Sequence, residues 1–210
     1  CRGERQAEVQ KLAAQLVLGK PLFWVDAEEL RARIEAKRWV RGLQIRKDPP
    51  DRLSLAIEER RPVLWLVRPN GVFLVSADGV LLDRVNQANL NPIPVVVDPA
   101  SQTDQGLARL VSAARMLREK QQGFYERITE LRDSPKGPVA YIEGLPAPIY
   151  LSRKDVTKNV PNFQRLFVDR LSQRPDLARL RYIDLRWDDE VAVRGLPGDG
   201  TVPGLRPGAG

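Results

Sequence analysis

The chain offers few side chains suited to catalysis. Its 210 residues contain no histidine and one cysteine, Cys1. Histidine is the commonest general base and metal ligand at neutral pH, so Ser-His-Asp and Cys-His catalysis and histidine zinc sites are excluded. The adjacent acids Asp188 and Asp189 are the best remaining pair, but neighbouring residues on a strand point to opposite faces and would not flank one glycosidic bond. We therefore predict no enzyme activity, no metal site and no cofactor.

Composition indicates a folded protein with a mixed surface. The net charge is +7 and the pI is about 9.8, which would suit an anionic partner, but basic and acidic residues alternate along most of the chain. No run interleaves aromatic and basic residues in the way that binds single-stranded nucleic acid, so none is expected as a partner. No run reaches the roughly 20 apolar residues that cross a bilayer. Cys1 fits a fragment boundary, which we favour, or the lipidated residue of a processed lipoprotein.

The first part of the chain has the pattern of two helices followed by a β-hairpin. Gly19 stands where the first helix should stop, and Asp26 is a suitable N-cap for the second, with an acid at the third helical position. Trp24 and Trp39 fall at junctions between elements and are expected in the core. The predicted helices are Glu8 to Leu18 and Ala27 to Lys37, and the hairpin strands are Val40 to Lys47 and Leu53 to Ile57.

From Pro62 onward, short apolar runs alternate with turn signals. Asn70-Gly71 and Asp78-Gly79 favour tight hairpins, because Gly and Asn tolerate positive φ. Two helices are predicted, Thr103 to Gln121 and Val160 to Ser172, and strands at Val63 to Val67, Val72 to Val75, Val80 to Leu82, Ile93 to Val97, Ile128 to Leu131, Val139 to Ile142, Ile149 to Leu151, Tyr182 to Trp187 and Val191 to Val193. The predicted division is a first domain at 1–66, a β-rich domain at 67–196 and a disordered Gly/Pro-rich tail at 197–210.

The predicted elements carry a series of motifs. They are Gly19, Phe23, Asp26, Leu30, Ile34, Trp39-Val40, Arg46-Lys47, Pro50-Asp51-Arg52-Leu53, Glu58-Glu59-Arg60-Arg61-Pro62-Val63, Phe73 to Val80, Ile93-Pro94-Val95 and Tyr182-Ile183-Asp184-Leu185-Arg186-Trp187. These motifs resemble those of the FtsQ/DivIB family of bacterial cell division proteins. The first part of the chain is similar to the family's POTRA (polypeptide-transport-associated) domain, and the second part to its β domain.

The resemblance implies an α+β fold. A small domain of two helices on a short sheet comes first, and a mixed, mainly antiparallel β domain with helices on one side follows. The family's POTRA domain begins with a strand ending in Gly-Asn, whereas only Gly3-Glu4 stands at that point here. We therefore expect that this strand, and the membrane helix before it, are missing from the chain, which would leave one edge of the small sheet exposed.

The resemblance also implies a function. It predicts a non-enzymatic scaffold that links early and late division proteins and controls septal cell-wall synthesis. Its partners would be FtsB and FtsL, together with the septal synthase pair FtsW and FtsI. The chain would lie on the periplasmic side of the inner membrane at the division septum, anchored by an upstream single-pass helix. In the family, the last strands of the β domain accept a segment of FtsB as an added strand, because an open edge offers unpaired N–H and C=O groups.

Carried onto this chain, the partner-binding positions lie near the end of the β domain. They are Trp187, Arg186, Asp189, Val191 and Val193. Tryptophan and arginine are enriched at interface hot spots. The alternatives are that Trp187 packs on the core and that Arg186 only pairs with a neighbouring acid, Asp184 or Asp188.

A second group of candidate contacts lies in the first domain. Arg46, Lys47 and Arg52 stand near the hairpin turn, where they would contact a membrane surface or another division protein, or simply form a solvated turn. The alternative for the whole chain is a POTRA-containing protein of outer-membrane assembly or transport. Such a protein would need several POTRA copies or a barrel of alternating strands, and the sequence has neither.

Overall fold

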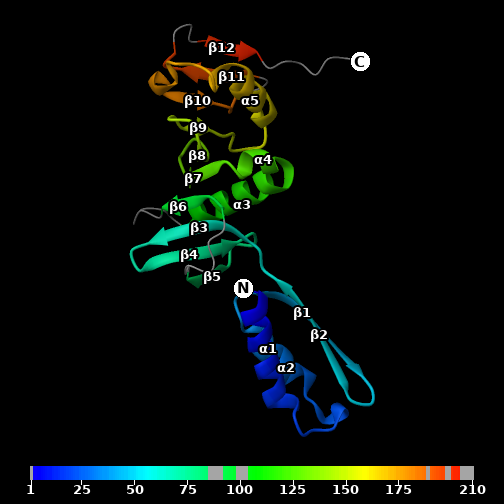
Figure 1. The fold of residues 1–210 in the computed structure, drawn as a ribbon. Coiled ribbons are helices and arrows are strands. Elements are labelled where there is room, and N and C mark those ends of the chain that lie inside the picture. The colour runs from blue at the N-terminus through cyan, green and yellow to red at the C-terminus, as the bar shows by residue number, and fades with distance from the viewer. Residues whose placement is uncertain (1, 85–91, 98–103, 188–189, 197–199, 204–210) are drawn as a thin grey trace, which may run out of the picture.

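The computed structural model describes residues 2–84, 92–97, 104–187, 190–196 and 200–203. These residues form two domains joined end to end (Figure 1). The helices are α1 (Arg2–Val17), α2 (Ala27–Glu35), α3 (Asp104–Lys120), α4 (Gln122–Tyr125) and α5 (Val160–Leu166). The strands are β1 (Val40–Asp48), β2 (Arg52–Glu59), β3 (Pro62–Arg68), β4 (Gly71–Ser76), β5 (Leu81–Arg84), β6 (Val95–Val97), β7 (Ile128–Arg132), β8 (Val139–Ile142), β9 (Ile149–Tyr150), β10 (Tyr182–Asp184), β11 (Glu190–Arg194) and β12 (Gly200–Pro203).

The first domain packs α1 and α2 against the antiparallel β1–β2 hairpin. Asp26 caps α2 as predicted, because its Oδ1 accepts hydrogen bonds from the amides of Glu28 and Glu29 at 2.9 and 3.0 Å. The core contains Val9, Leu30, Ile34, Trp39, Val40 and Leu43. Trp39 is buried as expected, whereas Trp24 is 74% exposed and the prediction that it lies in the core is wrong.

Helix α1 begins earlier than its apolar periodicity predicted. It starts at Arg2 and not at Glu8. Its first turns contact β2 and the residue that precedes β1. The Arg5 guanidinium pairs with Glu59 at 2.8 Å and lies 5.1 Å from the centre of the Trp39 ring. Between α1 and β2 runs a groove of about 600 Å³, lined mainly by apolar side chains of both elements. Within the described residues, β2 pairs with β1 alone.

The second domain is built on one long mixed sheet. Its strand order is β12-β11-β10-β9-β8-β7-β6-β3-β4-β5, and the parallel neighbours are β3 with β6, β6 with β7, and β9 with β10. The remaining described pairings are antiparallel, including the β3–β4 and β4–β5 hairpins at the predicted turns. Helices α3, α4 and α5 lie on one side of the sheet in Figure 1. The mixed, mainly antiparallel α+β architecture is confirmed.

The two sheets meet earlier in the chain than the predicted boundary between residues 66 and 67. The small sheet ends at Glu59 and the long sheet begins at Pro62, so that boundary falls inside β3. Strand β3 belongs to the long sheet because β4 and β6 pair with its two edges. The Arg60 side chain forms an ion pair with Asp78 of the β4–β5 turn. This ion pair links the segment between β2 and β3 to the long sheet.

The end of the chain also differs from prediction. Residues 200–203, assigned to a disordered tail, form β12 and pair antiparallel with β11. Pairing of this kind uses backbone groups, so the glycine and proline composition of the segment did not reveal it. The other residues of that predicted tail, 197–199 and 204–210, lie outside the described part of the chain.

Candidate partner-binding site

The candidate site occupies the end of the long sheet formed by β10, β11 and β12. Strand β10 pairs in parallel with β9 on one side and antiparallel with β11 on the other. Strand β11 then pairs with β12 over Glu190 to Val193. The edge of the sheet is therefore β12, and both sides of β11 carry hydrogen-bonded neighbours.

Two of the predicted contact residues, Val191 and Val193, direct their side chains into the core. Val191 is 2% exposed and Val193 is 8% exposed, and both belong to the main hydrophobic core. Alternation along a strand directs every second side chain to the same face, and here that face is the core. The side chains of Val191 and Val193 therefore pack inside the domain, and a partner strand would meet these two residues through the backbone of β11.

Arg186 is held in an ion pair at the end of β10. Its Nε and Nη2 atoms donate to the Asp184 carboxylate at 2.8 and 2.6 Å, and its amide donates to the same carboxylate at 3.0 Å. The guanidinium also lies 5.1 Å from the centre of the Tyr150 ring, a cation–π contact. Arg186 therefore pairs with Asp184, one of the two neighbouring acids that the sequence offers. About a quarter of the Arg186 side chain remains exposed.

The electrostatics of this pair favour the charged carboxylate. Burial raises the pKa of Asp184, but hydrogen bonds from the Arg186 side chain and amide, together with the arginine charge, outweigh that effect. The pKa of Asp184 therefore lies below its ordinary value, and the pKa of Arg186 is raised by the hydrogen bond to Asp184. Because the pair stays ionised and paired at neutral pH, its main effect is to fix the backbone that leads to Trp187.

Trp187 is the exposed aromatic residue of this region. Its side chain is 58% exposed, so the alternative that it packs in the core is wrong. Asp189, the remaining predicted contact, lies outside the described residues. A tryptophan displayed on a turn at the end of a sheet is the type of residue that anchors a protein interface.

Asn159, which sequence reasoning did not single out, holds this turn in place. Its side-chain amide nitrogen donates to the carbonyls of Leu185, Trp187 and Glu190 at 3.4, 2.5 and 3.2 Å. Asn159 is buried and adopts a left-handed backbone at φ 59° just before α5. Asparagine is one of the few residues that tolerate this conformation. One side chain therefore ties the start of α5 to both sides of the turn that carries Trp187.

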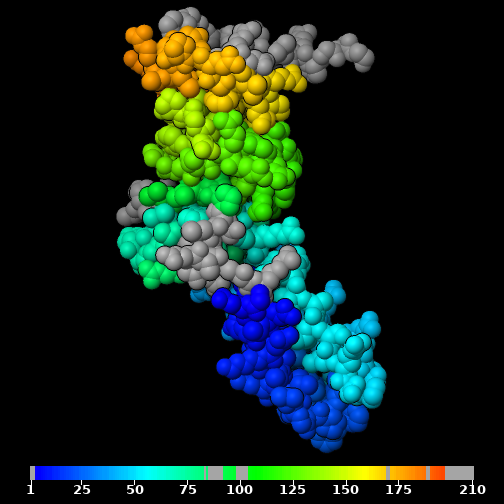
Figure 2. All heavy atoms as spheres, viewed as in Figure 1, coloured from blue at the N-terminus to red at the C-terminus, as the bar shows by residue number. Residues whose placement is uncertain are grey.

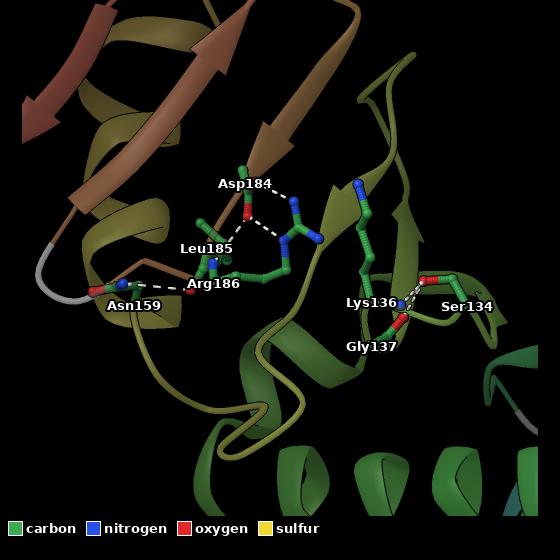
Figure 3. Close-up of polar contacts among 7 residues, drawn as sticks. All are labelled: Ser134, Lys136, Gly137, Asn159, Asp184, Leu185 and Arg186. Carbon is green, nitrogen blue, oxygen red and sulfur yellow. Dashed lines mark hydrogen bonds and ion pairs between the residues drawn. The ribbon is translucent and has the colours of Figure 1, made fainter.

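Figure 3 shows Asn159 and the Asp184–Arg186 pair together with a neighbouring turn, Ser134 to Gly137. The Ser134 hydroxyl donates to the carbonyl of Gly137 at 2.7 Å and accepts from the amide of Lys136 at 3.3 Å. Lys136 is exposed and extends away from this turn in the close-up.

The predicted contacts of the first domain lie at the opposite end of the molecule. Arg46 and Arg52 are exposed, and Arg46 pairs with Asp48 at 2.6 Å. The Lys47 ammonium donates to the backbone carbonyl of Val25 at 2.6 Å. The structure therefore does not bring these three residues together with Trp187.

Within the described residues, no group of three or more Cys, Asp or Glu side chains is placed to hold a metal ion. No helix in the same part of the chain is both long and apolar enough to cross a membrane.

The fold defines a two-domain α+β protein, in which a helix–helix–hairpin domain precedes a long mixed sheet. Residues 4–60 match the family model for the POTRA domain, FtsQ-type, and residues 63–186 match the model for Cell division protein FtsQ/DivIB, C-terminal. The chain therefore belongs to the FtsQ/DivIB family of cell division proteins, and the resemblance noted in the sequence is confirmed.

Curated relatives match along most of the chain. It is 27% identical over 203 residues to cell division protein FtsQ of Caulobacter vibrioides, covering 95% of this chain and 62% of that protein. It is 25% identical over 190 residues to FtsQ of Alcanivorax borkumensis, covering 90% and 70%. The chain thus spans about 62% of the length of the first of these relatives.

A solved structure also matches. It is the major extracytoplasmic domain of the cell division protein DivIB from Geobacillus stearothermophilus, at 15% identity and a TM-score of 0.31 over 40% of this chain and 72% of that one.

Proposed function

We propose that this chain is a non-enzymatic scaffold of the bacterial division machinery that binds FtsB and FtsL at the β10–β12 end of its long sheet. In this role it links early and late division proteins, including the septal synthase pair FtsW and FtsI, and controls septal cell-wall synthesis. The observation that carries the proposal is Trp187, which is 58% exposed on a turn whose carbonyls are held by the buried Asn159. Membership of the family supplies the biological setting.

The geometry favours a contact centred on the turn. An exposed aromatic on a fixed backbone loses little conformational entropy on binding, which is the general advantage of a preorganised hot spot. Arg186 contributes by fixing the backbone through Asp184, and its exposed part can meet an acidic partner side chain. Asp189 stays a proposed partner contact.

Strand addition, as the family resemblance implies, must take account of β12. Because β12 pairs with β11, an incoming partner strand either extends the sheet from the outer edge of β12 or takes the place of β12 beside β11. Pro203 has no N–H, so the end of β12 opposite Glu190 is a poor template for further pairing. If β12 were displaced, the backbone N–H and C=O groups of β11 that now pair with β12 would be free to pair with the partner strand.

We further propose that the chain faces the periplasm at the division septum, joined to a single-pass inner-membrane helix. Arg46, Lys47 and Arg52 then belong to a different surface from the FtsB and FtsL site, because they lie in the first domain.

The test is a titration of the 210-residue chain with the soluble part of its cognate FtsB, alone and with FtsL. Trp187→Ala should weaken binding at least tenfold, which corresponds to about 1.4 kcal/mol. Trp24→Ala is the matched control, because it removes another largely exposed tryptophan from the first domain. Absence of binding by the folded wild-type chain, or equal losses from both substitutions, would refute the proposed site.

A chain ending at Leu196 separates the two forms of strand addition. It lacks β12 but keeps the core residues Val191 and Val193. Tighter binding by this shorter chain supports replacement of β12, and weaker binding supports extension from it.

A further inference from the structure

Large exposed hydrophobic side chains gather in one loop of the first domain. Leu18, Phe23 and Trp24 are 78%, 82% and 74% exposed, and all three lie in the connection between α1 and α2. They make up half of the large hydrophobic side chains that are exposed in the described part of the chain. We call these three residues the apolar tip. Their concentration in one short segment is unlike the scattered apolar exposure of an ordinary soluble surface.

The backbone that carries the apolar tip is anchored. Leu22 is 8% exposed and Val25 is 3% exposed, so the residues on either side of Phe23 and Trp24 are buried. Asp26 caps the following helix, and the Lys47 ammonium donates to the carbonyl of Val25 at 2.6 Å. Phe23 and Trp24 are therefore displayed outward by a fixed 3-10 turn between two anchors.

The loop lies at the end of the first domain farthest from the long sheet. Figure 1 shows the α1–α2 connection beside the turn between β1 and β2, and Figure 2 shows that both form the lower end of the molecule in this view. The candidate FtsB and FtsL site lies at the other end, on β10 to β12. The apolar tip is thus a separate surface that the proposed partner site does not use.

Basic side chains surround this end of the domain. They are Lys20, Arg46, Lys47 and Arg52, all exposed. Glu28 and Glu29 in the first turn of α2 pair with Arg31 and Arg33 of the same helix, and the other acids of the region are Asp26, Asp48 and Asp51. The Asp26 carboxylate accepts bonds from the first amides of α2, which lowers its pKa, and Asp48 pairs with Arg46. The four bases Lys20, Arg46, Lys47 and Arg52 therefore exceed the three acids Asp26, Asp48 and Asp51 by one, and this end of the domain carries a net positive charge at neutral pH.

We propose that the apolar tip inserts into the headgroup region of an anionic lipid bilayer, with Lys20, Lys47 and Arg52 meeting the lipid phosphates. Tryptophan and phenylalanine partition to the membrane interface, and lysine and arginine next to them gain from the negative surface potential. A convex end that presents apolar side chains within a cationic rim fits a bilayer surface better than it fits a protein pocket.

The experiment is flotation of the 210-residue chain with phosphatidylglycerol–phosphatidylcholine vesicles and, separately, with phosphatidylcholine alone. The wild-type chain should float with the anionic vesicles, and its tryptophan emission should shift to the blue as Trp24 leaves water. The double substitution Phe23→Ser with Trp24→Ser should lower the vesicle affinity at least tenfold. Added salt should weaken the binding without abolishing it, because only the cationic rim is screened.

The controls separate the proposed contact from general effects. Trp187→Ser, which changes an exposed tryptophan at the other end, should leave vesicle binding unchanged. Leu22 and Val25 are intact in the double variant, and urea unfolding should show wild-type stability. Vesicle binding that the double variant retains, or a wild-type chain that does not float, overturns the proposal. A wild-type dimer that the double variant loses, without vesicle binding, overturns it in favour of a contact between two copies.

Discussion

Replacement of Asn159 tests how the Trp187 turn is built. The Asn159→Ala change removes the donor to the carbonyls of Leu185, Trp187 and Glu190 and places alanine at φ 59°. Leaving buried carbonyls without a donor costs about 1–3 kcal/mol, and the left-handed backbone costs alanine about 1 kcal/mol. We expect a loss of about 3 kcal/mol, which is a large part of the roughly 5–15 kcal/mol stability of a typical domain.

The Asn159→Gly change separates the two effects. Glycine loses the same hydrogen bonds but adopts φ 59° without strain, so it should be about 1 kcal/mol more stable than alanine at this position. Urea unfolding of the wild type and both variants, followed by tryptophan fluorescence, gives the three free energies of unfolding. Both variants should also bind FtsB more weakly than the wild type, although Asn159 is buried. A loss below about 1 kcal/mol for Asn159→Ala would refute the view that this side chain holds the turn.

Three further predictions concern the second domain. Asp184→Asn should cost about 2 kcal/mol at neutral pH, because it breaks the bidentate contact with Arg186. The pKa of Asp184 is lowered in the folded chain, so the stability it contributes is present above about pH 4 and is lost on acidification below that, which urea unfolding against pH measures. Burial raises the pKa of Tyr125 to about 12, so ultraviolet titration should show one late tyrosine and stability should fall between about pH 10 and pH 12. Gly137→Ala should destabilise strongly, because φ is 126° and the new Cβ would lie 2.7 Å from a backbone carbonyl, whereas Gly144→Ala at φ 77° meets nothing nearer than 4.0 Å.

Each of these has an outcome that would contradict it. An Asp184→Asn chain whose stability falls as steeply in acid as that of the wild type would show that other carboxylates control the acid transition. A Tyr125→Phe chain that keeps the late ultraviolet phase would assign that phase to another tyrosine. Equal destabilisation by the two glycine substitutions would mean that backbone strain, and not the close carbonyl, decides the cost.

The sequence predicted the start of α2 and the tight turns well, because a few adjacent residues determine them. Asp26 caps α2 through its own side chain, and Gly79 closes the β4–β5 turn at φ 82°. Alternating apolar residues located both strands of the first hairpin. Such features depend on the conformational preferences of a few adjacent residues and therefore appear in the sequence itself.

The candidate site was predicted less well. Trp187 and Arg186 were identified from the resemblance to the family, but Val191 and Val193 proved to be core residues. An alternating strand looks the same in sequence whether its apolar face meets the core or a partner. Asn159 gave one weak signal, an asparagine immediately before a predicted helix, which any helix start can show.

By itself, the sequence determined the class of protein: an α+β chain without histidine, with two helices and a hairpin before a β-rich domain, and with the motifs of FtsQ/DivIB. Only the tertiary structure decided which tryptophans are exposed, that β12 covers β11, and that Asn159 holds the Trp187 turn. These properties depend on contacts between residues distant in the chain. Exposure and long-range pairing follow from how the elements pack, and local propensity does not encode them.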